Sequence, residues 1–193
     1  MQRIVTPYSK KFEPFAWWKG AFTAQELDKL QDKARSATEE AYVGSTDPGE
    51  INPEIRRSEL SWVKNDAEFG WVFEKLSHVA SSLNADYFHF DLVGFGEPIQ
   101  LTNYGESNQG MYRWHQDFGG RISRKLTLVL QLSDPADYEG GNLEVLISSE
   151  SKVMRKERGL IIAFPSWTLH QVTPVVKGNR QTLVVWISGP DFK

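Results

Sequence analysis

The hydrophobic pattern of this chain changes its period near the middle, and this change most limits the folds open to it. From Tyr87 onward, apolar residues alternate with polar ones in short stretches that are separated by clusters of Gly, Pro, Asn and Asp. A period of two is typical of half-buried strands. Many short strands without helices between them indicate an antiparallel sandwich or a jelly roll.

The strand predictions come from these alternating stretches. We expect antiparallel strands at 87–93, 99–104, 111–116, 126–132, 142–147, 160–164, 168–175 and 180–188, with a short one near 152–155. The predicted fold class is therefore α+β and mainly β, a double-stranded β-helix (jelly roll) with its core at 98–188. Residues 1–97 would add helical support and extra strands to the same single domain, which spans 1–193.

Two helical stripes precede the strands. Thr23 to Glu26 match a capping box, and apolar residues follow at helical spacing at Leu27, Leu30, Ala34, Ala37 and Ala41. Asn65 to Glu68 form a second cap pattern before the apolar stripe of residues 69–83. We expect both helices to brace one sheet from outside. The loop at 43–53 between them is rich in helix breakers and long enough to act as a gate.

Composition excludes several classes of partner. The chain has 193 residues, with 22 Lys and Arg against 25 Asp and Glu, and a formal net charge of −3. Without a basic field, neither nucleic acid nor an anionic membrane is expected as a partner. No apolar run reaches about 18 residues, so we expect a cytoplasmic protein. Cysteine is absent, which leaves histidine and carboxylate side chains as candidate metal ligands.

His115 and Asp117 form the strongest chemical signal. Alternate side chains of a strand share a face, so a His-x-Asp pair can reach one ion. His170, in a later strand-like stretch, can supply a third ligand. Two imidazoles and one carboxylate leave coordination positions open, which suits Fe(II) and O2 chemistry. Arg180 follows, and its planar guanidinium suits a carboxylate, so a diacid could bridge the ion and the arginine.

Each of these residues has a plainer explanation when taken alone. A His-x-Asp pair is more often a hydrogen-bonded pair at a strand end, and an isolated arginine is more often solvated. A zinc hydrolase with the same ligands is a further alternative, but no His-Glu-x-x-His pattern supplies a general base. Order, spacing and strand context together favour the metal site. His78 and His89 have no ligand pattern around them and are assigned no metal role.

Several motifs in the second half of the chain resemble those of one family. They are, in order, QLTNYG from Gln100, YRWHQD from Tyr112, RKLT from Arg124, YEGGNL from Tyr138, FPSW from Phe164 with His170 after it, and KGNR ending at Arg180. Together they resemble the prolyl 4-hydroxylase-like group of Fe(II)/2-oxoglutarate-dependent dioxygenases, and within it the PKHD-type hydroxylases. The resemblance covers residues 98–188, whereas residues 1–54 carry little of it.

The resemblance implies a role for each matching residue. The Fe(II) ligands would be His115, Asp117 and His170. The contacts to 2-oxoglutarate would be Arg180, at its distal carboxylate, with Tyr104, Thr127 and Gln131. Arg124 would either engage the substrate or be a solvated residue at a strand entry. Some relatives carry Tyr where this chain has Gln131, or Lys where it has Arg180. The differences from the family pattern therefore concern the contacts to the cosubstrate. Tyr112, Trp114 and Trp186 are expected to be packing residues.

The resemblance also implies an activity. The enzyme would use Fe(II), 2-oxoglutarate and O2, with ascorbate as a supporting reductant, to hydroxylate an unactivated C–H bond and release succinate and CO2. A prolyl residue in a peptide or protein is the favoured target, and a small molecule such as a free amino acid stays open. The alternative is a non-catalytic jelly-roll module that binds a metal or a diacid. That alternative predicts a missing ligand or anion anchor, and neither is missing. The oligomeric state is left unknown.

Overall fold

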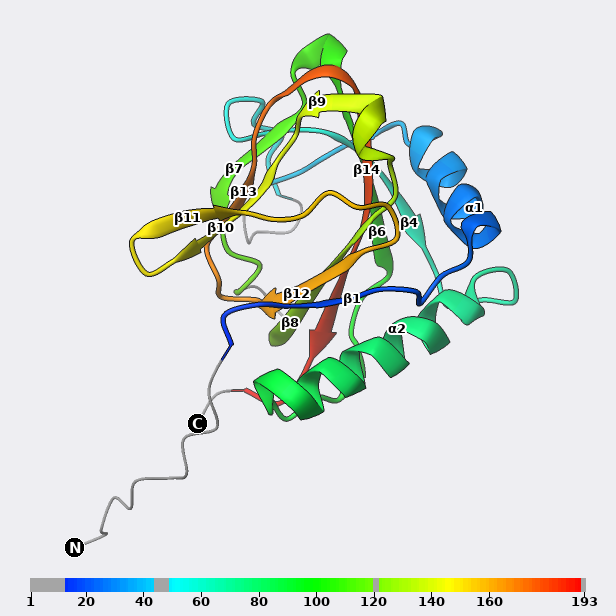
Figure 1. Ribbon diagram of the computed structural model, residues 1–193, viewed down its shortest axis with the longest axis vertical. Helices are drawn as coiled ribbons and strands as arrows, with labels where there is room; N and C mark the ends of the chain where they lie inside the picture. The colour runs from blue at the N-terminus through cyan, green and yellow to red at the C-terminus, as the bar shows by residue number, and fades with distance from the viewer. Residues whose placement is uncertain (1–12, 44–48, 120–121, 192–193) are drawn as a thin grey trace, which may run out of the picture.

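Two antiparallel β-sheets pack face to face, and the helices α1 (Ala24–Arg35) and α2 (Gly70–Leu83) lie on the outer side of one of them (Figure 1). A computed structural model describes residues 13–43, 49–119 and 122–191. Strands that are distant in sequence are neighbours in both sheets. This two-sheet arrangement is consistent with a jelly roll and confirms the predicted fold class.

The larger sheet carries both helices. Its path follows the order β1 (Ala16–Trp18), β12 (Ile161–Pro165), β8 (Arg124–Gln131), β14 (Val175–Ser188), β6 (Ile99–Gly105), β4 (Glu59–Val63) and β2 (Glu39–Glu40). Two short strands also pair with β14, namely β5 (Gly94–Phe95) and β9 (Tyr138–Gly140). The strands of the N-terminal half therefore extend this sheet at both of its edges.

The smaller sheet brings together segments from the middle and the end of the chain. Its order is β11 (Glu150–Val153), β10 (Leu143–Ile147), β13 (His170–Val172), β7 (Met111–His115) and β3 (Arg56–Arg57). The hairpin of β10 and β11 reaches out beyond the sandwich (Figure 1). At the other edge, the two residues of β3 pair with β7, so a short segment of the N-terminal half forms the edge strand next to β7.

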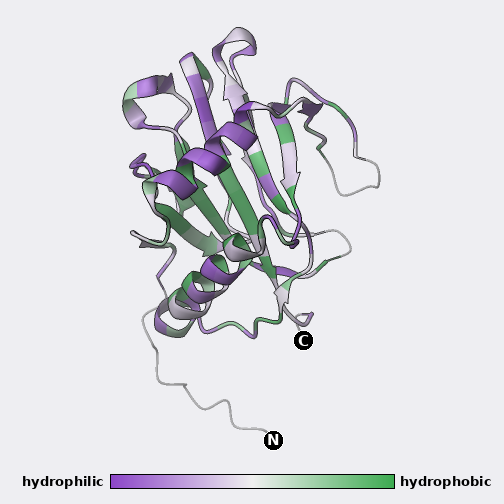
Figure 2. Cartoon of the chain, turned by 90° about the vertical axis from the view of Figure 1, so that its right-hand side faces the viewer, coloured by the Kyte–Doolittle hydropathy of each residue, from purple (hydrophilic) through white to green (hydrophobic). Residues whose placement is uncertain are grey.

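Alternation along β8 divides the apolar interior into two layers. Leu128 and Leu130 face the helices, where they share one cluster with Leu30 of α1 and Leu76 of α2. Figure 2 shows both helices lying across the hydrophobic strands of the larger sheet. Val129 points the other way and packs in a second cluster with residues of the smaller sheet. The predicted bracing by two helices is confirmed. Among the described residues, no helix is long and apolar enough to cross a membrane.

The N-terminal ends of the two helices can be compared with the cap patterns that the sequence predicts. α1 begins with the predicted capping box, in which the Thr23 hydroxyl accepts from Glu26 N at 3.3 Å and the Glu26 carboxylate accepts from Thr23 N at 2.7 Å. Before α2, the side chain of Asp66 instead of Asn65 accepts from two backbone N–H groups, each at 3.0 Å. The predicted cap thus marks the turn before the helix, whereas α2 itself begins at Gly70 without a side-chain cap hydrogen bond.

The prediction that the first helical stripe continues to Ala41 is wrong. α1 ends at Arg35, and the chain beyond it becomes extended and pairs with β4 as β2. Ala37 and Ala41 are nevertheless buried, and Ala41 N donates to Ser58 O at 3.1 Å. Extended chain that crosses the core can bury alanines at the same spacing as a helix, which is why the spacing alone misled.

The predicted strand at 87–93 is also wrong. A π-helical turn at Asn84–Phe88 extends α2, and His89 follows in a left-handed conformation with φ of 58°. The Asn84 side chain fixes this turn, because its amide accepts from Phe90 N at 2.8 Å and donates to Phe90 O at 2.9 Å. Phe88 and Phe90 stack with ring centroids 5.7 Å apart. The alternation of aromatic residues therefore reflects local stacking and not strand pairing.

The last two predicted strands have different boundaries in the structure. β13 covers only His170–Val172, whereas β14 begins at Val175 and runs through the predicted turn at 177–179. Gly178 permits this because its φ is 70° and an added Cβ would lie 2.1 Å from Asp137 O. The bend lets one strand pair with both β9 and β6. The other strand predictions are confirmed to within two residues at each end.

Candidate metal centre and adjoining cavity

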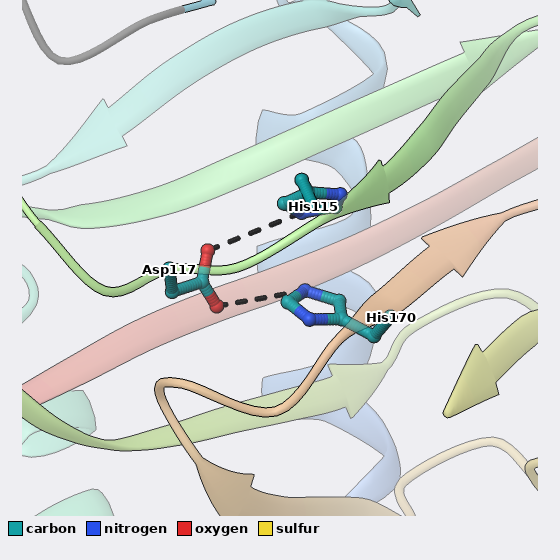
Figure 3. Close-up of side chains that lie close together, drawn as sticks. All are labelled: His115, Asp117 and His170. Atoms are coloured by element: carbon teal, nitrogen blue, oxygen red, sulfur yellow. Dashed lines mark ion pairs between the residues drawn. The ribbon is translucent and has the colours of Figure 1, made fainter. Parts of the chain in front are cut away.

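Three side chains from adjacent segments converge between the sheets. His115 ends β7 and His170 begins β13, and strand pairing sets these histidines opposite each other. Asp117 follows β7, its N–H donates to Ser166 O at 2.9 Å, and its carboxylate points at both imidazoles (Figure 3). Nε2 of His170 lies 3.5 Å from Asp117 Oδ2, and Nε2 of His115 lies 4.0 Å from Asp117 Oδ1. The candidate ligand atoms all lie within 4.8 Å of one another.

The convergence depends on a bend as well as on strand geometry. The sequence argument places His115 and Asp117 on one face of a strand at 111–116, but β7 ends at His115, so Asp117 reaches the site from the segment after it. In the described part of the chain, no other three His, Asp or Glu side chains come together in this way. His78 packs instead against Trp18 of β1, with ring centroids 5.7 Å apart.

Backbone carbonyls fix the orientation of both imidazoles. Nδ1 of His115 lies 2.7 Å from Arg113 O, and Nδ1 of His170 lies 2.9 Å from Thr168 O. Because a carbonyl oxygen only accepts hydrogen bonds, each Nδ1 carries the proton and each Nε2 presents its lone pair toward Asp117. The two rings are held with centroids 4.1 Å apart.

The surroundings also set the charge of these groups. Burial, followed by repulsion from His170, lowers the pKa of His115 to about 3, so that this imidazole is neutral near pH 7. Burial raises the pKa of Asp117, but attraction to His170 and His115 outweighs it, and the net pKa lies below the ordinary value. A neutral imidazole and an ionised carboxylate are the forms that bind a metal ion.

Buried hydroxyl groups support the Asp117 carboxylate. Thr127 Oγ1 on β8 donates to Asp117 Oδ2 at 2.8 Å, and the hydroxyl oxygens of Thr127 and Ser166 lie 3.1 Å apart. The sequence predicts a cosubstrate contact for Thr127, whereas its hydrogen bond in the structure goes to a candidate metal ligand. The sequence analysis does not single out Ser166, for which membership of the FPSW motif is the available signal.

Arg180 is almost completely buried on β14, with 1% of its surface exposed. Its Nη2 donates to Gln131 Oε1 at 3.2 Å, and its guanidinium lies 5.5 Å from the ring of Tyr104 on the paired strand β6. Nε and Nη1 are buried and have no hydrogen-bond partner in the structure. Burying a guanidinium without its partners is costly unless an anion completes the site. These atoms, together with the imidazole and carboxylate donors, fit a divalent metal with an anionic ligand.

A cavity of about 520 Å³ joins the candidate metal ligands to Arg180. Its walls come from both sheets and include Tyr104 and Arg124 of the predicted site. The sequence analysis did not assign a binding role to other lining residues, which include Tyr42, Arg56, Tyr112, Phe118 and Trp186. The exposed side chains of Tyr42, Ile55 and Phe118 mark the open side of the cavity.

The predicted gate loop contributes two residues to this cavity. Val43 and Glu50 line it and are joined by two backbone hydrogen bonds of 2.8 and 2.9 Å. Residues 44–48, at the centre of the predicted gate, lie outside the described residues. Ile55, which follows, also lines the cavity. The two ends of the predicted gate, Val43 and Glu50, therefore lie at the cavity, and gating itself stays a prediction.

The structure gives Tyr112 a neighbour that was not expected, and it removes one of the two roles predicted for Arg124. Tyr112, expected to be a packing residue, stacks on His115 with ring centroids 3.4 Å apart and lines the cavity. Arg124 is not a solvated residue, because its Nε and Nη2 each donate to the Glu97 carboxylate at 2.6 Å. The Arg124 guanidinium also lies 3.9 Å above the ring of Trp186. Pairing between chain segments, which is not visible in the local sequence, neutralises this arginine.

A family profile and two related proteins match this chain in sequence. The sequence profile of the 2OG-Fe(II) oxygenase superfamily matches residues 99–188. A PKHD-type hydroxylase of Sphingopyxis alaskensis is 32% identical over 180 residues, which cover 85% of this chain and 78% of that protein. A PKHD-type hydroxylase of Synechococcus sp. (strain CC9902) is 44% identical over 89 residues, 45% of this chain and 40% of that protein.

Solved structures share the fold at low sequence identity. A prolyl-4-hydroxylase of Pseudomonas putida superposes with a TM-score of 0.72 at 17% identity, covering 92% of this chain and 94% of that one. A prolyl hydroxylase of Trichoplax adhaerens, solved with a peptide fragment of hypoxia inducible factor, gives a TM-score of 0.74 at 16% identity, covering 91% and 83%. At these identities the likeness concerns the fold alone.

Proposed function

This chain belongs to the 2OG-Fe(II) oxygenase superfamily and is a hydroxylase that uses Fe(II), 2-oxoglutarate and O2; from this premise, we propose that it hydroxylates a prolyl residue in a peptide or protein and releases succinate and CO2. The observation that carries the proposal is that three candidate metal ligands and a buried arginine surround one cavity. The names of its relatives and fold neighbours, PKHD-type and prolyl hydroxylases, support a prolyl target.

Four side chains would hold the metal and the cosubstrate. His115, Asp117 and His170 would bind Fe(II) through two nitrogens and one carboxylate, a set that leaves positions open. Arg180 would bind the distal carboxylate of 2-oxoglutarate, and its unpartnered Nε and Nη1 support this role. Gln131 would keep the guanidinium in place through its hydrogen bond to Nη2.

The chain itself supplies orientation and a dry environment. When bound, Fe(II) and 2-oxoglutarate supply the oxidising chemistry, in which one oxygen atom of O2 enters succinate and the other enters the substrate C–H bond as a hydroxyl group. Thr127 and the backbone carbonyls of residues 113 and 168 hold the ligand side chains in fixed orientations. The apolar side chains of Val129 and Leu143 in the cavity wall exclude water from the reacting C–H bond.

The open side of the cavity supports a polypeptide as substrate. Tyr42, Ile55 and Phe118 line the cavity and are 45%, 36% and 49% exposed. Large apolar side chains that are exposed together around a cavity are typical of surfaces that bind other proteins. A substrate segment that covered them would bury apolar surface and shield the metal from solvent at the same time.

The test is hydroxylation of defined peptides. Acetylated and amidated peptides with one proline are incubated with the protein, Fe(II), 2-oxoglutarate and ascorbate, and mass spectrometry follows the gain of one oxygen, about 16 Da, on proline. We expect one succinate for each oxygen gained, no product with Asp117→Ala, and full activity with His78→Ala. His78 is the matched control because it lies on α2, outside the site. Oxygen gain on free amino acids with no peptide modified would refute the peptide assignment.

A further inference from the structure

Arg56 is a second buried arginine of the cavity, and no carboxylate of the described residues pairs with it. It lies on β3 in the smaller sheet, is 8% exposed, and lines the cavity. Its Nε donates to Ser58 Oγ at 2.9 Å. Within the described part of the chain, its Nη1 and Nη2 donate to no other residue and no carboxylate forms an ion pair with it. By contrast, the Arg124 guanidinium in the same cavity is paired with Glu97.

The position of Arg56 relates it directly to the metal ligands. Its guanidinium lies 4.6 Å from the centroid of the Tyr112 ring, which is opposite Arg56 in the pairing of β3 with β7. The Tyr112 ring in turn stacks on His115 at 3.4 Å. One aromatic ring therefore separates Arg56 from a candidate metal ligand. A group held by Arg56 would lie next to the reaction centre without occupying the metal.

Arg56 and Arg180 approach the cavity from opposite sheets. Arg180 projects from β14 of the larger sheet, where Gln131 already binds one of its nitrogens. Arg56 projects from β3 at the edge of the smaller sheet, one residue after the exposed Ile55. Arg180 therefore enters the cavity from the larger sheet, and Arg56 enters it next to Ile55, one of the residues that mark its open side. If the cosubstrate takes Arg180, Arg56 is left for the molecule that enters from the open side.

Stacking on Tyr112 offsets only part of the cost of burying the Arg56 charge. A cation–π contact uses the face of the guanidinium, while its edge keeps N–H donors that suit the two oxygens of a carboxylate. Such a donor edge, open to the cavity, suits an anionic ligand that enters it. Because the cosubstrate carboxylate is assigned to Arg180, an anion bound at Arg56 would belong to the substrate.

We propose that Arg56 binds a carboxylate of the substrate and so selects an acidic group close to the residue that is hydroxylated. This inference rests on the proposed function, since it assumes that the substrate enters the cavity from the open side. The carboxylate has two possible sources, an acidic side chain of a peptide or the α-carboxylate at a chain end or in a free amino acid. In both, the recognised chemistry is the same planar anion.

Binding in the absence of O2 tests the proposal without turnover. The full chain is loaded anaerobically with Fe(II) and 2-oxoglutarate and mixed with acetylated, amidated hexapeptides that contain one proline and, in matched pools, Glu, Gln or Lys at each other position. A second arm compares acetylated prolyl peptides that end in a free carboxylate or in an amide, and L-proline with L-prolinamide. Retained molecules are identified by mass spectrometry after rapid gel filtration.

We expect the wild-type protein to retain carboxylate-bearing probes about tenfold over their neutral partners, as one desolvated charged contact provides. Arg56→Gln should abolish the preference, Arg56→Lys should keep part of it, and Arg56→Glu should favour the Lys pool. Arg35→Gln is the matched control, because this arginine at the end of α1 is exposed, does not line the cavity and pairs with Asp32 at the surface. It should leave the preference unchanged.

The outcomes separate this inference from the proposed function. The role of Arg56 would be overturned if acidic and neutral probes were retained equally, or if no probe were retained. It would also be overturned if the preference for acidic probes survived in Arg56→Gln. A purely structural arginine would lower the melting temperature and the retention of all probes alike. On admission of O2, proline oxygenation without carboxylate preference would remove the inference and keep the function. Carboxylate selection with oxygen gained on another residue would keep the role of Arg56 and refute the prolyl assignment.

Discussion

The two sides of the cavity are built in different ways. Beside the larger sheet, Arg180, Gln131 and Tyr104 are 1%, 2% and 4% exposed and come from the central strands β14, β8 and β6. On the open side, Tyr42 and Phe118 are 45% and 49% exposed and come from segments between strands. The side that we propose to bind one small diacid is formed by packed strands with fixed side chains. The side that we propose to accept a larger partner is formed by connecting segments, where substitution disturbs the core least.

The largest effect is expected where the two sides meet, at the metal ligands. His115→Ala removes one of three donors and should abolish succinate formation, with a loss of iron affinity beyond the roughly 10- to 100-fold that a lost supporting contact causes. Bound iron and 2-oxoglutarate consumption are the measurements, and His78→Ala is the control. A His115→Ala protein that still formed succinate would remove the premise that both sides serve one metal.

Arg180→Met tests the buried side. Loss of a buried charged contact costs about 2–5 kcal/mol, so the dissociation constant for 2-oxoglutarate should rise by roughly 30- to several thousand-fold. Arg180→Lys should retain part of the affinity because it keeps the charge. The ligand-free Arg180→Met protein should melt at a higher temperature than wild type, since an unpaired buried charge is removed.

Arg56→Gln is compared with Arg180→Met, because it changes the arginine that comes from the smaller sheet. We expect its 2-oxoglutarate affinity to stay within about twofold of wild type, as for a substitution that shares no partner with the ligand. Equal losses of 2-oxoglutarate affinity in both variants would show that the two sides are not separate. Titration of each protein with 2-oxoglutarate in the presence of Fe(II), under anaerobic conditions, measures this directly.

Thr127→Val tests the support beneath the metal ligands. The substitution keeps the shape of the side chain but removes the hydrogen bond to Asp117 Oδ2. We expect iron affinity to fall by about 10- to 100-fold. Thr127→Ser should restore most of it, because the hydroxyl is retained. An unchanged iron affinity in the valine variant would mean that Asp117 keeps its orientation without this hydroxyl, and a competition titration with an iron chelator decides between the two.

Tyr42→Ala should have the smallest effect, because this side chain is half-exposed. Loss of one contact at the edge of a binding surface costs about 1 kcal/mol, which corresponds to a roughly fivefold rise in KM for the substrate. The 2-oxoglutarate affinity should not change. Trp17→Ala is the matched control, since Trp17 on β1 is similarly exposed, at 51%, but does not line the cavity. A larger change for 2-oxoglutarate than for substrate would contradict the division between the two sides.

Local sequence signals correctly predicted those helices and strands whose formation depends on residues close to one another in the sequence. The capping box at Thr23 and the strands at 99–104 and 111–116 were found because one residue or one alternating stretch decides them. The strand predicted at 87–93 failed because the Asn84 side chain bonds the backbone of Phe90, a contact that alternation does not reveal. The first helix was predicted too long because Ala37 and Ala41, which lie in extended chain on either side of β2, are buried at a helical spacing.

The sequence by itself indicated the chemistry of this protein: the strand pattern of a jelly roll, His115, Asp117 and His170 as candidate metal ligands, and Arg180 as a candidate contact for a carboxylate. Only the tertiary structure decided which other polar groups face the cavity. Arg56 reaches it because β3 pairs with β7 across more than fifty residues of chain. Alternation tells which face of a strand a side chain occupies, but its neighbours depend on pairing between distant segments, which the local pattern does not encode.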